Sequence, residues 1–120
     1  VVVGLSYKKI GDAIIISEGE KLVRLISLGY GVTQGVDHKR KTPNQVSTVD
    51  INQAPDWYQR GISAALLAPT AINQQKFKFS LYEGNKVSVK AGIGFYSKVD
   101  LGIVKYHFEQ AAGIENFNWK

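Results

Sequence analysis

APTAINQQKFKF, residues 68–79, places an uncharged, amide-rich turn region between a predicted helix and a predicted strand. Apolar residues at helical spacing predict a helix over residues 57–67. Pro69 ends this helix, because the residue before a proline is pushed out of the helical region. Alternating phenylalanines then predict a strand over residues 76–82, with one face directed at a core. The strand is expected to hold the loop against that core.

The loop carries polar side chains without charge: Thr70, Asn73, Gln74 and Gln75. One hydroxyl and three carboxamides can donate and accept hydrogen bonds in one plane, which suits the edge of a heteroaromatic ring better than a phosphate. The same residue types also cap turns between a helix and a strand. Taken by themselves, these residues leave ligand binding and turn formation open.

The stretch APTAINQQKF resembles the Pro-Ser-x-x-Asn-x-Gln-Pro-Trp loop of the FMN-dependent nitroreductase family, in which an alanine-rich helix also precedes the loop. Lys76 and Phe77 depart from the pattern, since the family usually has proline and tryptophan there. Four positions match in register, with threonine in place of serine: Pro69, Thr70, Asn73 and Gln75. The resemblance implies FMN as the cofactor, with its ring and ribityl edge contacted by Pro69, Thr70, Ala71, Asn73 and Gln75.

A hairpin and a second helix follow the loop. Gly84-Asn85 predicts a turn between strands at residues 76–83 and 86–91, because both residues tolerate positive φ. The run Ser97-Lys98-Val99-Asp100 predicts a capping box that opens a helix ending near Ala112, with Gly113 as its stop. We assign Asp100 to capping and Glu109 to a surface pair with Lys105. The expected buried stripe consists of Leu101, Val104, Phe108 and Ala111.

This helix is similar to one in a nitroreductase subgroup, with Asp-Leu-Gly-Ile at residues 100–103 and His-Phe-Glu at residues 107–109. In that subgroup two half-domains lie on one polypeptide and resemble the two subunits of the usual homodimer. The resemblance implies that residues 1–50 end a first half and residues 51–120 form a second half, together one compact domain or a fragment. Because residue 1 is Val and Met is absent, we expect a homodimer partner or a missing N-terminal half to complete the flavin site.

The first fifty residues predict a strand end at residues 1–4, a short helix at 7–15 and an apolar strand at 22–28. LVRLISLGYG, followed by HKRKTPNQV, is similar to the end of a classical nitroreductase domain, where a Lys-x-Arg-x-Pro stretch binds phosphate. The resemblance implies that Lys39 and Lys41 hold the FMN phosphate, with a lysine point charge replacing the family's arginine fork at position 41. It also places Gly4 near the reactive side of the flavin ring.

Composition limits the class of protein. The chain has 120 residues, 44% of them hydrophobic, and no cysteine. It can build a small core, and it lacks disulfides, a thiolate nucleophile and cysteine-based metal sites. No signal peptide or long apolar run is present, so we expect a cytoplasmic location without membrane contact.

The net charge of +5 raises the question of a nucleic-acid partner. The run His38-Lys39-Arg40-Lys41 could contact a polyanion, or it could be a solvated loop. The charges are concentrated in one loop, and Phe77 and Phe79 alternate as a buried face, so we expect no nucleic-acid partner. Lys39 and Lys41, which are two positions apart and precede Pro43, favour binding of a phosphate group instead.

The sequence predicts no catalytic side chain and no metal ligand set. The two histidines lack metal-site spacing, no serine-centred nucleophile motif is present, and paired carboxylates are scarce. This fits a flavoenzyme, because the flavin carries the hydride. The resemblance implies that NAD(P)H reduces FMN and that a small electron-poor acceptor, such as a nitroaromatic or a quinone, takes the electrons.

A non-catalytic flavin-binding or interaction domain of the same fold is the alternative. The expected fold class is α+β and nitroreductase-like, with a mixed, mostly antiparallel sheet of residues 22–28, 76–82 and 86–91. Helices at residues 57–67 and 101–112 are expected to flank this sheet.

Overall fold

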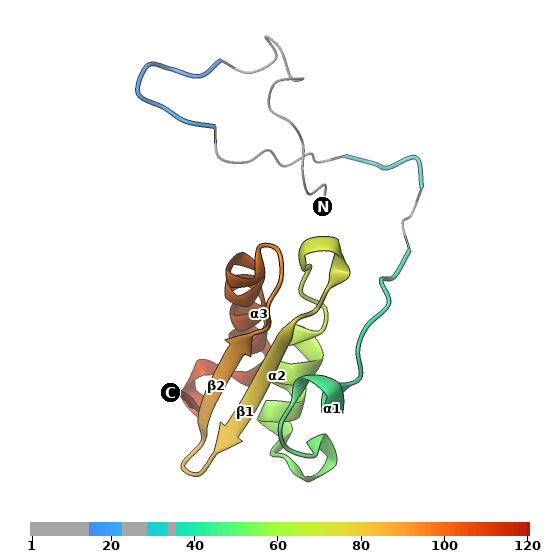
Figure 1. Ribbon diagram of the computed structural model, residues 1–120, viewed down its shortest axis with the longest axis vertical. Helices are drawn as coiled ribbons and strands as arrows, with labels where there is room; N and C mark the ends of the chain where they lie inside the picture. The colour runs from blue at the N-terminus through green and yellow to red at the C-terminus, as the bar shows by residue number, and fades with distance from the viewer. Residues whose placement is uncertain (1–14, 23–28, 34–35) are drawn as a thin grey trace. The chain divides into compact units, whose positions relative to one another are not determined.

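The computed structural model describes residues 15–22, 29–33 and 36–120 (Figure 1). The chain divides into two compact units, Val1–Val36 and Asp37–Lys120. In the first unit, the described residues form no helix or strand. The elements predicted at residues 1–4, 7–15 and 22–28, and with them the predicted site residue Gly4, lie outside the described residues except for Ile15 and Leu22.

A mixed sheet forms one layer of the second unit. It consists of β1 (Phe77–Tyr82), β2 (Lys86–Ala91) and the short β3 (Asn118–Trp119), in the order β1-β2-β3. β1 and β2 are antiparallel, whereas β3 pairs with β2 in parallel. Two residues are too few to show an alternating pattern, so β3 was not predicted from the sequence.

The predicted hairpin between β1 and β2 is confirmed. Gly84 and Asn85 both adopt positive φ, at 68° and 53°. Because Tyr82 pairs with Lys86, the connection has three residues rather than the two of the tightest hairpins. The alternation in β1 is also confirmed, with Phe77 and Phe79 buried on one face.

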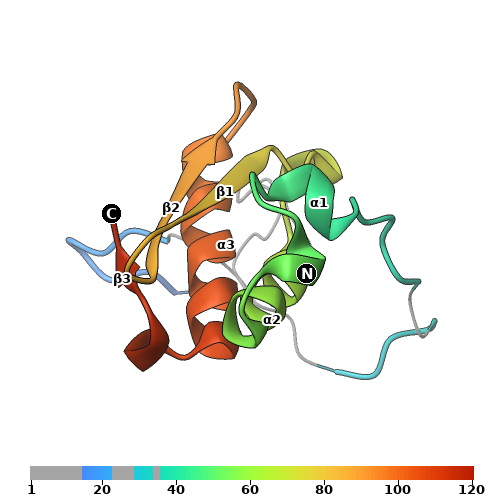
Figure 2. The ribbon, with the colours of Figure 1, turned by 90° about the horizontal axis from the view of Figure 1, so that it is seen from below.

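Two longer helices, α2 (Asp56–Ala65) and α3 (Ser97–Ala112), lie side by side on one face of the sheet (Figure 2). α2 ends two residues earlier than predicted, because Leu66 and Leu67 continue as a turn before Pro69. Gly113, at φ 80°, ends α3 as predicted. The short elements are α1 (Pro43–Val46) and the 3₁₀ turns η3 (Ile51–Gln53), η4 (Ala71–Asn73) and η5 (Ile114–Asn116).

The core between the two layers is aromatic. The Phe79 ring of β1 stacks on the Phe108 ring of α3, with centroids 4.7 Å apart. Tyr58 and Phe117 meet Phe108 edge to face, at 5.7 Å and 5.2 Å. Such pairs add about 0.5–1.5 kcal/mol each to the burial of their apolar area. The ring of Phe108 therefore joins α3 to the sheet and to α2.

The buried stripes agree with the sequence pattern in most positions. Ile62 and Ala65 of α2 and Val104 and Phe108 of α3 are fully buried. At the end of α3, Ala112 takes the buried position that was expected for Ala111. The observed architecture is α+β with a small mixed sheet, as predicted. Within the described ranges, no helix has the length and apolar character needed to cross a membrane.

Candidate functional site

The two segments that were predicted to bind a ligand lie against each other. Residues 37–42 precede α1, and residues 70–76 lead from η4 into β1, in the yellow loop at the start of that strand in Figure 1. They are 34 positions apart in sequence where Lys41 meets Gln75. Hydrogen bonds from the side chains of Asn73 and Gln75 join the two segments, and Thr70 holds the Gln75 backbone within the loop. We call residues 37–42 the basic segment, and the side chains of Thr70, Asn73 and Gln75 the amide clamp.

Gln75 is the central residue of the amide clamp and is only 3% exposed. Its Oε1 accepts a hydrogen bond from the backbone N–H of Lys41 at 2.9 Å, and its Nε2 donates to the carbonyl of Lys39 at 2.8 Å. The Gln75 carboxamide therefore bridges two peptide groups of the basic segment, as a backbone amide of a neighbouring strand would do. In return, Lys41 Nζ donates to the Gln75 carbonyl at 2.8 Å.

Asn73 and Thr70 complete the amide clamp. Asn73 Nδ2 donates to the carbonyl of Lys39 at 2.9 Å, and Asn73 Oδ1 accepts from Gln75 Nε2 at 2.8 Å. Thr70 Oγ1 accepts from the Gln75 backbone N–H at 3.0 Å. Each side chain of the amide clamp thus contacts the basic segment or another member of the clamp.

The backbone of the loop is strained at three residues. Ile72, Asn73 and Gln75 have positive φ values of 46°, 54° and 45°. The left-handed region costs about 1–2 kcal/mol for a residue with a side chain, and a β-branched residue such as isoleucine is a marked outlier there. Strain of this kind persists only where neighbouring contacts determine the conformation, and it gathers at binding and catalytic sites.

A second set of contacts holds the other end of the loop. Asp100 Oδ1 accepts from the backbone N–H of Ala71 at 3.0 Å, and Asp100 Oδ2 accepts from Gln74 Nε2 at 2.7 Å. The same Gln74 nitrogen donates to the carbonyl of Phe95 at 2.6 Å. Gly94 lies against the Gln74 side chain, where a Cβ would collide with it. Asp100 therefore anchors the loop to α3.

The predicted capping box at residues 97–100 is wrong. Tyr96, at φ 55°, is the residue that precedes α3, and Asp100 is 7% exposed and bound to the loop instead. Asp100 precedes Val104 by four residues and Phe108 by eight, which places all three on one face of the helix. A carboxylate on the buried face was the sequence signal that could have indicated this role.

The expected pair between Glu109 and Lys105 is also wrong. Glu109 Oε1 accepts from Trp119 Nε1 at 2.6 Å, and Lys105 Nζ lies 4.3 Å from the centroid of the Trp119 ring. Among the described residues, the one ion pair joins Arg40 to Asp37. Glu109 and Lys105 thus both serve to hold β3 against α3.

The surface around the loop combines positive charge with apolar groups. Lys39, Arg40 and Lys41 are exposed residues, although Arg40 pairs with Asp37 and Lys41 Nζ donates to the Gln75 carbonyl. The rings of Phe95 and Tyr96 lie 4.2 Å apart by their centroids. Four apolar side chains on the loop and on the β2–α3 connection are largely exposed, namely Ile72, Ile93, Phe95 and Tyr96, and Val99 in the first turn of α3 is partly exposed. This arrangement suits a ligand with a phosphate at one end and a planar apolar group at the other.

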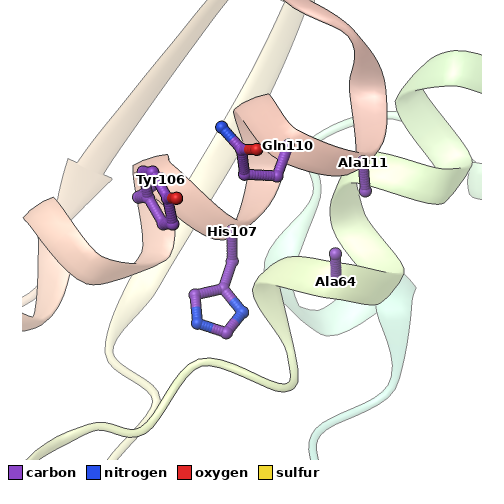
Figure 3. A pocket seen from close by; sticks show the side chains of 5 residues that line it. All are labelled: Ala64, Tyr106, His107, Gln110 and Ala111. Carbon is purple, nitrogen blue, oxygen red and sulfur yellow. The ribbon is translucent and has the colours of Figure 1, made fainter.

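A shallow hollow of about 300 Å³ lies on α2 and α3, away from these residues. Figure 3 shows its lining by Ala64, Tyr106, His107, Gln110 and Ala111. His107 is half-buried on α3. No group of three His, Cys, Asp or Glu side chains that could hold a metal occurs in the part of the chain that the structure describes. The hollow therefore offers no chemistry comparable to that of the loop.

The comparisons with known proteins agree with one another. The sequence model of the family described as "Putative TM nitroreductase" matches residues 2–112. Among solved structures, a "putative nitroreductase" from Thermotoga maritima is similar, with 26% sequence identity and a TM-score of 0.59. The match covers 69% of this chain and 36% of that chain, so this chain spans little more than a third of that protein. None of the curated proteins matches the sequence.

Proposed function

The chain belongs to the nitroreductase family described as "Putative TM nitroreductase", and we propose that it forms part of an FMN-dependent oxidoreductase. When bound, FMN supplies the redox chemistry, taking a hydride from NAD(P)H and passing electrons to a nitroaromatic or quinone-like acceptor. The residues of this chain hold and orient that cofactor, and none of them acts as a catalytic acid or base. A cytoplasmic location, with access to NAD(P)H, is part of the proposal.

The contact between the amide clamp and the basic segment is the observation that best supports this function. It brings Lys39 and Lys41 to the loop that carries Pro69, Thr70, Ala71, Asn73 and Gln75. A lysine ammonium has three hydrogens, so the single bond from Lys41 Nζ to the Gln75 carbonyl leaves two for phosphate oxygens. Lys39 and Lys41 would hold the flavin phosphate, and the exposed apolar side chains near the loop would contact the ring.

Residues outside this chain are part of the proposal. The chain spans 36% of the similar Thermotoga maritima protein. We propose that a homodimer partner, or another part of the same protein, covers the apolar side chains and closes the flavin pocket. Flavin binding is therefore best tested on the intact protein.

The first experiment is the visible absorbance of the purified protein, followed by an FMN titration that records quenching of flavin fluorescence. We expect saturable binding, and bleaching of the bound flavin by NADH or NADPH under anaerobic conditions. Lys39→Ala should weaken FMN binding about fivefold, which corresponds to about 1 kcal/mol for a partly solvated charge contact. Lys90→Ala, which removes an exposed charge from β2, is the matched control and should bind FMN normally.

One observation favours a non-catalytic domain of the same fold. The carboxamides of Asn73 and Gln75 are already hydrogen-bonded within the chain, as a purely structural turn would require. Under this alternative, the intact protein would bind no flavin, or would bind it without reduction by NAD(P)H. The titration and the bleaching experiment separate the two functions.

A further inference from the structure

We propose that Gln75 is a positioning residue that makes the site selective for a phosphorylated flavin, and that its side chain does not contact the flavin ring. The inference rests on the proposed function. In this inference Gln75 acts on the cofactor indirectly, by holding the basic segment in place. The sequence resemblance implies instead a direct contact between Gln75 and the flavin.

The hydrogen-bonding capacity of the Gln75 side chain is largely used within the chain. Its two Nε2 hydrogens have acceptors at 2.8 Å in the Lys39 carbonyl and in Asn73 Oδ1. Its Oε1 accepts from the Lys41 backbone N–H. With the side chain 3% exposed, a ring contact would require Gln75 to leave these partners and expose buried peptide groups.

The bridge made by Gln75 determines where the basic segment lies. It joins the carbonyl of Lys39 to the N–H of Lys41, so both peptide groups must face the loop. Lys41 Nζ is held over the loop backbone by the carbonyl of the same glutamine. The Gln75 side chain thus fixes the backbone at two of the three cationic residues of the segment, Lys39 and Lys41.

Pre-organisation of this kind increases affinity for a ligand that needs both cations at once. A charged segment that moves freely must lose conformational freedom when a phosphate binds, and that loss lowers the affinity. With Gln75 in place, most of this ordering is complete before the phosphate arrives. The benefit applies to FMN and not to riboflavin, because riboflavin lacks the phosphate.

The test compares FMN with riboflavin in the intact protein, using wild type and Gln75→Met, which keeps an unbranched side chain and removes both hydrogen-bonding groups. Fluorescence titrations should show that Gln75→Met binds FMN about tenfold more weakly, a change of about 1.4 kcal/mol, while riboflavin affinity changes less than twofold. Hydrogen exchange should also become faster at the Lys41 amide in the variant, even without flavin.

Asn73→Ala provides a second variant that does not disturb the core, because Asn73 is exposed. It removes one of the two donors to the Lys39 carbonyl. It should therefore lower FMN affinity by a smaller factor than Gln75→Met does, with the fold intact. It keeps the proposal testable if Gln75→Met does not fold. Gln53→Met, on the exposed side of η3, is the matched control for the glutamine substitution.

Two results would overturn the proposal, and they differ in what else they affect. If Gln75→Met, or Asn73→Ala in its place, lowers FMN and riboflavin affinity by the same factor, the clamp contacts the ring and the positioning role is wrong, while the proposed function stands. If wild-type protein binds neither flavin, the proposed function fails and the inference fails with it. Because wild-type protein is titrated first, a failure of the proposed function is known before any variant is compared.

Discussion

Tyr58 is fully buried in the core and hydrogen-bonds to Ser47 Oγ at 3.1 Å. Burial raises the pKa of Tyr58 above its ordinary value of 10.0, because the ionised phenolate would lose its hydration, and the Ser47 hydrogen bond offsets part of that rise. The folded state therefore favours the neutral side chain more than the unfolded state does.

The sign of the resulting pH dependence follows from proton linkage. The unfolded chain loses the Tyr58 proton at lower pH than the folded chain, so the stabilisation is fully present below pH 10.0. It is then lost as the pH rises through the higher pKa of the folded state. We expect Tyr58→Phe to abolish this alkaline loss, and to cost about 1 kcal/mol at pH 7 because Ser47 loses a partner.

Urea unfolding followed by circular dichroism at pH 7, 9, 10 and 11 measures both effects. Wild type should lose more free energy of unfolding than Tyr58→Phe between pH 9 and 11. Ser47 keeps its hydrogen bond to the Val49 carbonyl in the variant, so the loop around it should remain folded. Equal losses in the two proteins would show that Tyr58 does not contribute to alkaline unfolding.

At the scale of elements, the packing of α2 on α3 depends on Gly61. A Cβ built on Gly61 would lie 2.5 Å from Cε2 of Phe108, the ring that joins α3 to the sheet. We expect Gly61→Ala to destabilise the protein by about 1–3 kcal/mol, because overpacking outweighs the gain of about 1 kcal/mol in helix propensity.

Gly102 in α3 is the matched control, since nothing lies within 4 Å of a Cβ built there. Gly102→Ala should therefore stabilise the protein by about 0.5–1 kcal/mol through helix propensity alone. Thermal unfolding of the two variants beside wild type gives the comparison. A stabilised Gly61→Ala would mean that α2 and α3 can separate at little cost.

The elements that could be predicted are those with local signals. Alternation of Phe77 and Phe79 identified β1, Gly84-Asn85 identified the hairpin, and Gly113 identified the end of α3. Each signal comes from residues close together in sequence. The exact end of α2 was harder to predict, because Leu66 and Leu67 continue the apolar pattern beyond the helix.

The features that escaped prediction depend on partners far away in sequence. Asp100 binds Ala71, 29 positions away, so a pattern read along the chain assigned it to its own helix. Gln75 binds Lys41, 34 positions away. The sequence identified both segments as candidates for one site, by resemblance, but it could not show that their polar groups bind each other. The roles of the site residues toward a flavin stay a prediction.

At the scale of the whole molecule, the described core belongs to one unit. Its buried residues run from Val46 to Phe117, and all of them lie within Asp37–Lys120. We expect a chain of residues 37–120 to fold by itself, with one cooperative unfolding transition within about 5 °C of the transition of the longer chain, which corresponds to a change of about 1 kcal/mol or less. It should retain the amide clamp, because the basic segment begins within this unit.

Differential scanning calorimetry of the two chains tests this expectation, and hydrogen exchange at the Lys41 amide reports on the clamp. A shortened chain without a cooperative transition would show that residues 1–36 are needed for folding of the unit. Loss of Lys41 protection alone would show instead that they are needed only to hold the basic segment.

The parallel pairing of β3 with β2 has a consequence for the order of folding. Paired residues in the β1–β2 hairpin are at most 14 positions apart in sequence, whereas Val87 and its partner Trp119 are 32 positions apart. A parallel pair cannot be closed by a tight turn, and here the intervening chain includes all of α3. The entropy lost on closing a loop grows with its length, so this pairing carries the larger kinetic barrier. We therefore expect the hairpin and the helices to form first, and β3 to complete the sheet after α3 has docked.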